Sequence, residues 1–201
     1  MYVMRKTATP NKSRSAIKEA SHERIVAVAA RAIRRSGYGG TGVADIMKEA
    51  GLTHGAFYAH FESREAMLVE AADLAGAQAN TAAQNVAAAV PTAQALQALI
   101  QAYLSKEHVK NIEIGCPTSA LASEMPRQTQ EVRRTSTRRI KEMIDLVARQ
   151  MPDWGQPSAF ERALATVSAM VGTLILARAV DEPALSDALC SATLKSLIPA
   201  T

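Results

Sequence analysis

Apolar side chains recur along this chain at intervals of three and four residues, the spacing that places them on one face of an α-helix. Few windows alternate apolar and polar residues, so strand signals are nearly absent. The pattern therefore predicts an all-α protein of short and medium-length helices. The expected helices occupy residues 21–36, about 43–50, 54–60, 63–90, 92–103, 118–125, about 140–147, 160–177 and 184–197.

The first predicted helix runs from an N-cap at Ser21 to Ser36. Gly37 follows its last turn, where the left-handed backbone that glycine tolerates commonly ends a helix. An apolar stripe is expected to face the core and four arginines are expected to stay outside. The stripe is Ile25, Val28, Ala29, Ala32 and Ile33, and the arginines are Arg24, Arg31, Arg34 and Arg35.

Two short apolar-periodic stretches, separated by Gly51 and Leu52, lie within residues 41–61. Gly51 suits a sharp exit from the first helix, and Thr53 is a good N-cap for the second. Phe57 is the expected anchor into the core, and Tyr58, about 100° further around the axis, faces outward. This is the shape of a helix-turn-helix, whose second helix enters the major groove of DNA. A helix pair without a nucleic-acid role shares the periodicity, so the turn, the aromatic pair and the basic N-terminus favour DNA.

Polar groups on the outer face of this unit suit a DNA contact. Hydroxyls, imidazoles and free helix N-terminal amides can donate to phosphate oxygens. Tyr58 and Arg64 are expected to hold phosphates, and His54 is expected to reach a base edge. The candidate contacting residues are Thr41, Thr53, His54, Gly55, Tyr58, His60 and Arg64.

The segment from Ser21 to Met67 resembles the DNA-binding domain of the TetR family of bacterial transcriptional regulators. Gly42 stands where a hydroxyl residue is common in that family, and His54 where a lysine is often seen. The matching residues are Gly37-Tyr38, Thr41, Val43, Asp45-Ile46, Ala50-Gly51-Leu52, Phe57-Tyr58, His60-Phe61 and Ser63-Arg64-Glu65.

The resemblance implies an N-terminal three-helix helix-turn-helix head followed by a larger helical effector-binding and dimerisation domain. It also implies a repressor whose last two helices form a homodimer interface and whose ligand moves the two heads apart. Two heads related by a dyad match a palindromic operator on double-stranded DNA. The expected division is a basic flexible arm over 1–20, the head over 21–67 and the ligand-binding and dimerisation domain over 68–201.

The formal charge of +4 lies in the first part of the chain. Residues 1–36 hold nine Lys/Arg and two Asp/Glu, as expected beside a phosphate-binding unit, although basic termini also occur without a partner. The cluster Arg133, Arg134, Arg138 and Arg139 is interpreted as the solvated face of a helix rather than a second nucleic-acid patch. The N-terminus lacks a signal-peptide core and no apolar run approaches 18 residues, so we expect a cytoplasmic protein without a membrane partner.

A small-molecule effector is expected among the C-terminal helices, because the resemblance implies a pocket there. Its candidate lining residues are Tyr103, Cys116, Met143 and Met170, although methionines at helical spacing are also typical of plain core. Few charged residues lie on the inward stripes, which favours a hydrophobic or aromatic ligand.

Cys116 supports an alternative, a thiol that senses electrophiles or oxidants. It precedes Pro117 at the expected start of a short helix, where N-terminal amides favour the thiolate. An inert buried cysteine is the competing interpretation. Cys116 and Cys190 are too few for a disulfide framework and match no metal site.

The chain is not expected to be an enzyme or to need a cofactor or metal. Its four histidines are scattered, no Gly-rich phosphate loop is present, and a pairing of Cys116 with His108 has no third member. An architectural DNA-binding protein without an effector is a further alternative, against which the size of the C-terminal part argues.

Overall fold

The computed structural model describes residues 10–198 of the chain. Its elements are helices, with no strand among the described residues, which confirms the all-α prediction. The head comprises α1 (Pro10–Ser36), α2 (Val43–Glu49) and the 3-10 helix η1 (His54–Ala59). The remaining helices are α3 (Arg64–Ala88), α4 (Thr92–Tyr103), α5 (Lys106–Lys110), α6 (Pro117–Leu121), η2 (Ala122–Arg127), α7 (Gln130–Ala148), α8 (Pro157–Ala179) and α9 (Pro183–Leu197).

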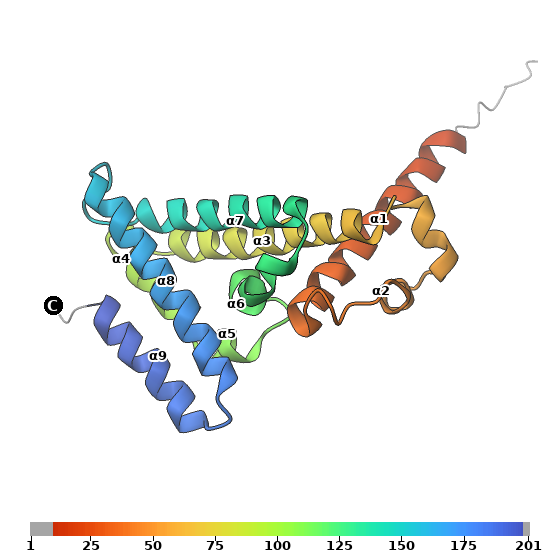
Figure 1. The fold of residues 1–201 in the computed structure, drawn as a ribbon. Coiled ribbons are helices and arrows are strands. Elements are labelled where there is room, and N and C mark those ends of the chain that lie inside the picture. The colour runs from red at the N-terminus through yellow and green to blue at the C-terminus, as the bar shows by residue number, and fades with distance from the viewer. Residues whose placement is uncertain (1–9, 199–201) are drawn as a thin grey trace, which may run out of the picture.

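The long helices α3 and α7 lie side by side along the length of the molecule, with the head at one end and α8 and α9 at the other (Figure 1). Gly76 on α3 allows the close approach, because a Cβ there would lie 2.5 Å from Cγ of Arg139 on α7. Arg139 then bonds Asp73, with Nε 2.7 Å from Oδ1 and Nη2 2.8 Å from Oδ2. Burial would raise the pKa of Asp73, but its bonds to Arg139 and Arg138 lower it, so the pair is ionised at neutral pH.

Three of the predicted helix-ending and helix-starting residues, Ser63, Gly37 and Gly51, act as expected. Ser63 accepts a hydrogen bond from the Ala66 amide at the start of α3, 3.1 Å away. Gly37 and Gly51 have φ of +73° and +71°, the left-handed backbone that closes α1 and turns the chain after α2.

The first helix begins at Pro10, eleven residues earlier than the predicted cap at Ser21, so a flexible arm over 1–20 is wrong for residues 10–20. Proline suits a first helical position, and the Lys, Arg, Ala and Glu residues that follow favour a helix. Residues 1–9 of the predicted arm lie outside the described part of the chain.

Arg34 is buried, which corrects its predicted place on the outer face of α1. Its Nη1 lies 3.5 Å from the Ala75 carbonyl oxygen and 3.4 Å from that of Gly115, and its Nη2 donates to Oε1 of Gln78 at 2.9 Å. Burial, together with nearby Arg31, lowers the pKa of Arg34 to about 10, so the side chain remains a cation at neutral pH. The five predicted apolar residues of α1 are buried as expected.

A single apolar core continues from the head into the second half of the molecule. It begins with α1, α2 and η1, follows α3 through Ala75, and includes Leu121 of α6 and Val132 of α7. Smaller cores lie further along, one around Met143 and Val147 and another around Met170 and Cys190. The head is therefore packed on, rather than loosely tethered to, the rest of the chain.

Candidate DNA-binding surface and effector pocket

The outer helix of the head, η1, has one apolar side and one open side. Phe57 is 2% exposed and lies 5.4 Å from Phe61, ring centre to ring centre. The next residue, Tyr58, is 73% exposed. Thr53, His54 and Gly55 are also exposed, and a Cβ at Gly55 would meet no atom within 4 Å. The structure thus brings four predicted contact residues to one open edge of the head.

Thr53 stands at the N-cap of η1 but its side chain caps no amide, contrary to the role that the sequence suggests. In this 3-10 helix the backbone bonds run from i to i+3, and the Ala56 amide donates to the backbone carbonyl of Thr53 at 3.0 Å instead of to its hydroxyl. The Thr53 hydroxyl is left without a capping bond at the exposed edge.

Two other predicted contact residues hold the loop between α1 and α2 instead. Thr41 is buried, and its hydroxyl donates to the Gly37 carbonyl at 2.7 Å. Arg64 Nη2 donates to the carbonyl oxygens of Thr41, at 3.1 Å, and of Tyr38. The Thr41 hydroxyl therefore does not face outward, and Arg64 fixes the loop backbone in place of the free cation that the sequence suggests.

His60 lies at the end of η1 and is half-buried beside His22, with ring centres 6.0 Å apart. Burial, then His22 and Lys18, lowers the pKa of His60, so its ring is neutral at pH 7. Lys18, which falls within the predicted arm, is an exposed cation of α1. Its spacing of four residues from His22 is the signal that places both on one face of a helix.

Three of the four predicted effector residues line one cavity of about 580 Å³. Tyr103 comes from α4, Cys116 from the loop before α6, and Met143 from α7. Alanines of α3 and α4 form much of the remaining wall, so small side chains leave the space open. Met170 is instead buried in a separate core with Ile100 and Cys190.

The loop of residues 111–116 has one side on this cavity and the other on the head. Asn111, Ile114, Gly115 and Cys116 line the cavity. The Gly115 carbonyl accepts from buried Arg34, and Glu113 Oε1 lies 3.2 Å from Nη1 of Arg35, both on α1. Arg35 also bonds Glu49 at the end of α2 with Nη2 at 3.1 Å from Oε2. The loop that lines the cavity is therefore bonded directly to α1, and through Arg35 and Glu49 it is connected to α2.

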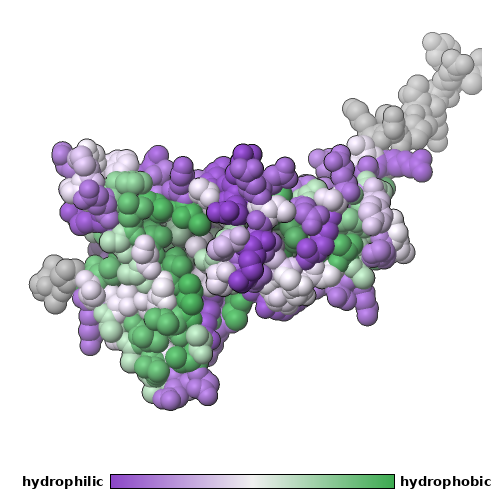
Figure 2. Space-filling view, viewed as in Figure 1, coloured by the Kyte–Doolittle hydropathy of each residue, from purple (hydrophilic) through white to green (hydrophobic). Residues whose placement is uncertain are grey.

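The far end of the molecule carries an exposed apolar face on α8 and α9, visible as the broad hydrophobic area in Figure 2. A Cβ at Gly172 on α8 would meet nothing within 4 Å. The length and hydropathy of α8 would suffice for a membrane-spanning helix. Its apolar character is explained by two apolar sides, one buried in the core and one in this exposed face. The exposed large apolar residues of the face are Phe160, Leu164, Ile175, Leu176 and Leu185.

Two family models match the chain and together cover more than two thirds of it. Residues 25–71 match the model described as "Bacterial regulatory proteins, tetR family". Residues 92–186 match the C-terminal domain described as "Transcriptional regulator LmrA/YxaF-like". The chain belongs to the TetR family. It is a TetR-family transcriptional regulator with the helix-turn-helix that the sequence predicts.

Curated relatives of this TetR-family chain carry regulator names. An uncharacterized HTH-type transcriptional regulator of Mycobacterium tuberculosis, Rv0196, is 29% identical over 168 residues, which are 78% of this chain and 83% of that protein. YerO of Bacillus subtilis, also an uncharacterized HTH-type regulator, is 39% identical over 51 residues. That match covers 25% of this chain and only 18% of YerO.

Solved structures show the same fold. The reduced form of NemR from E. coli superposes with a TM-score of 0.76 at 17% identity, over 89% of this chain and 95% of that one. A TetR transcriptional regulator from Chloroflexus aurantiacus has the same TM-score at 24% identity, over 90% and 96% of the two chains.

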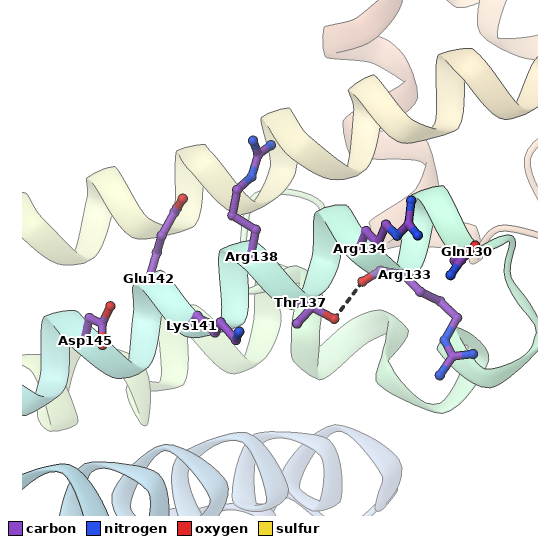
Figure 3. A pocket seen from close by; sticks show the side chains of 8 residues that line it. All are labelled: Gln130, Arg133, Arg134, Thr137, Arg138, Lys141, Glu142 and Asp145. Atoms are coloured by element: carbon purple, nitrogen blue, oxygen red, sulfur yellow. Dashed lines mark hydrogen bonds between the residues drawn. The ribbon is translucent and has the colours of Figure 1, made fainter.

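Three arginines of α7 in this TetR-family chain, Arg133, Arg134 and Arg138, line one groove. Arg133 and Arg138 point to opposite sides of the helix, along this groove of about 600 Å³ (Figure 3). Arg138 bonds Asp73, and Arg139, expected on the solvated face, is held by Asp73 and Glu142. Arg133 and Arg134 are exposed as expected.

Proposed function

We propose that the protein is a ligand-responsive repressor in the cytoplasm, which binds a palindromic operator as a homodimer and is released by a small hydrophobic or aromatic effector. The exposed edge of η1 supports the DNA contact, since Thr53, His54, Gly55 and Tyr58 stand free there above a packed core. Arg64 and Thr41 support it indirectly, by holding the loop that positions α2.

The exposed apolar face of α8 and α9 supports the homodimer. An apolar patch of this kind at one end of a soluble fold marks an interface. Gly172 allows the backbone of a second α8 to approach closely, because no side chain covers it. A dyad through this face leaves both heads at the far end of the molecule, where each can meet one half-site of an operator.

The shared loop of residues 111–116 is the observation that carries the ligand response. An effector in the cavity contacts the same loop that bonds Arg34 and Arg35 of α1. A shift of the loop therefore changes the position of α1, and with it the separation of the two heads in the dimer. The ligand and the DNA then favour different positions of one element, as coupled binding requires.

We expect Tyr58→Phe and His54→Ala to separate two kinds of DNA contact. Tyr58 is 73% exposed and its hydroxyl can meet a phosphate, so loss of the hydroxyl should weaken binding about tenfold on every sequence. His54 near the start of η1 should instead change which sequences bind best. Fluorescence anisotropy with the operator found by footprinting, at several salt concentrations, measures both effects.

Arg133→Ala is the matched control, because it removes an exposed cation from α7, outside the helix-turn-helix. The affinity of Arg133→Ala for the operator should equal that of the wild type. An unchanged sequence preference in His54→Ala contradicts the base-reading role, and binding that does not weaken with salt contradicts the operator contact itself.

A second candidate function, a thiol-based repressor that senses electrophiles or oxidants, is favoured by the position of Cys116. This thiol lines the cavity although it is only 5% exposed, so a reactive molecule that enters the cavity meets it. Oxidation or alkylation there adds atoms to the loop that holds Arg34.

Under the thiol-sensing function, hydrogen peroxide should release the wild type from its operator, and Cys116→Ser should abolish that release. Cys190→Ser is the matched control, since Cys190 is buried in a different core and outside the cavity. Peroxide-induced release that persists in Cys116→Ser rules the thiol function out. The measurement is operator occupancy before and after the oxidant.

A further inference from the structure

The inner wall of the cavity contains a histidine that carries no charge. Nδ1 of His108 lies 2.7 Å from the Tyr103 carbonyl, and Nε2 accepts from the Cys116 amide at 3.0 Å. A carbonyl accepts and an amide donates, so the ring is the neutral form with its proton on Nδ1. Burial lowers the pKa of His108, the Tyr103 hydrogen bond opposes this, and Arg178 adds to the lowering. Both ring nitrogens are therefore occupied, and the ring offers a ligand neither charge nor donor.

Tyr103 contributes the opposite feature, a donor without a partner. Its ring lines the cavity, and its hydroxyl oxygen is buried beside Cys116 and Ser119 but makes no hydrogen bond of normal geometry in the described part of the chain. Burial, and then the adjacent Cys116, raises the pKa of Tyr103 well above its ordinary value, so the hydroxyl keeps its proton. A buried hydroxyl without an acceptor destabilises the protein until something accepts its hydrogen bond.

The charges around the cavity exclude an ionic ligand group deep inside. The lining contains no lysine or arginine, and its one carboxylate, Glu107, is exposed. Ala79, Ala83 and Leu99 are typical of the inner surface, which is apolar. An anionic group at this wall would find no free cation, because the nearby Arg178 already donates to the carbonyls of His108 and Val109 and to the Ser119 hydroxyl.

We propose that the effector is a neutral, largely apolar molecule that bears a hydrogen-bond acceptor such as a carbonyl oxygen, and that this acceptor takes the hydrogen bond of the Tyr103 hydroxyl. The inference rests on the proposed ligand response and specifies its ligand class. The Cys116 thiol lies beside the buried hydroxyl and also lines the cavity, so the acceptor must displace this thiol to reach the hydroxyl.

Three probes of one shape test this class. They are 2-acetylnaphthalene, which has a carbonyl, 2-isopropylnaphthalene, which has none, and 2-naphthoate, which is an anion. Equilibrium dialysis against the full chain and against Tyr103→Phe gives the affinities. The preference for the ketone over the hydrocarbon should fall about tenfold in Tyr103→Phe, while the affinity for the hydrocarbon stays the same. The anion should bind the wild type at least tenfold more weakly than the ketone.

A variant that fills the cavity with a larger side chain tests whether the probes bind in it. Ala83→Phe on α3 should weaken both neutral probes, whereas Ala88→Phe, exposed near the end of the same helix and away from the cavity, should not. Tyr103→Phe removes only the unpaired hydroxyl, so its melting temperature should match or exceed that of the wild type.

An unchanged ketone preference in Tyr103→Phe overturns the proposal, as does tightest binding of 2-naphthoate or full binding to Ala83→Phe. Failure of both neutral probes to bind a protein that still binds its operator also overturns the ligand class but leaves the repressor function standing. Absence of operator binding in the wild type is the separate result that counts against the proposed function.

Discussion

Phe57→Ala should abolish operator binding by unfolding the core of the head, whereas Tyr58→Ala, one residue further on, should weaken binding in a protein that stays folded. Phe57 is 2% exposed and stacks on Phe61, so its truncation leaves a cavity and costs about 3–5 kcal/mol. A typical domain has a total stability of only about 5–15 kcal/mol, so the loss is a large part of it.

Urea denaturation followed by circular dichroism, together with anisotropy on the operator, measures the two effects. Tyr58 is the matched control, because its ring is 73% exposed and its removal should change stability by less than about 0.5 kcal/mol. Equal stability losses in the two variants would contradict the assignment of one ring to the core and the other to DNA.

Leu176→Arg should separate the dimer and, through it, reduce operator affinity. Leu176 is 53% exposed on α8 in the single chain, so the change should leave the fold of the monomer intact. In a dimer built on this face, two arginines related by a dyad would be desolvated close to each other, which costs several kcal/mol. The dimer dissociation constant should rise at least about a hundredfold.

Sedimentation equilibrium of the wild type and of Leu176→Arg tests this directly. Ile17→Arg is the matched control, since Ile17 is an equally apolar, 65% exposed residue of α1, the helix at the opposite end of the molecule from α8 and α9 (Figure 1). It should sediment as the wild type does. A Leu176→Arg protein that remains a dimer would show that the subunits meet through another surface.

Much of the head could be predicted from the sequence, because its determinants are local. The apolar stripe of α1 follows from a spacing of three and four residues, and the exits at Gly37 and Gly51 follow from their left-handed backbone. The burial of Phe57 and the exposure of Tyr58 follow from helix geometry as well, since adjacent side chains point about 100° apart.

The errors concern residues whose partners are distant in the sequence. Arg34 can be buried because the carbonyls of Ala75 and Gly115 accept its hydrogen bonds. Both acceptors lie outside α1, so the sequence pattern of α1 does not indicate them. Arg64 likewise finds its acceptors at Tyr38 and Thr41, across the head. A cation at helical spacing is ordinarily solvated, so only the tertiary structure could reveal these two exceptions.

The region of the cavity and three of its lining residues could be predicted, but the fourth predicted residue lies elsewhere. Tyr103, Cys116 and Met143 converge from α4, the loop before α6, and α7. Met170 has the same chemistry as Met143 but lies in another core, because periodicity shows that a residue is inward without showing which neighbour it faces.

The continuous core has a consequence for domain exchange between regulators of this kind. Leu121 and Val132, far beyond the predicted boundary at residue 67, pack in the same cluster as Ile25, Phe57 and Met67. A chimaera joined at that boundary would replace one half of this shared core with side chains from another protein, which would not be complementary to the half that remains. A graft that keeps its operator specificity should therefore carry α6 and the first turn of α7 along with the reading head.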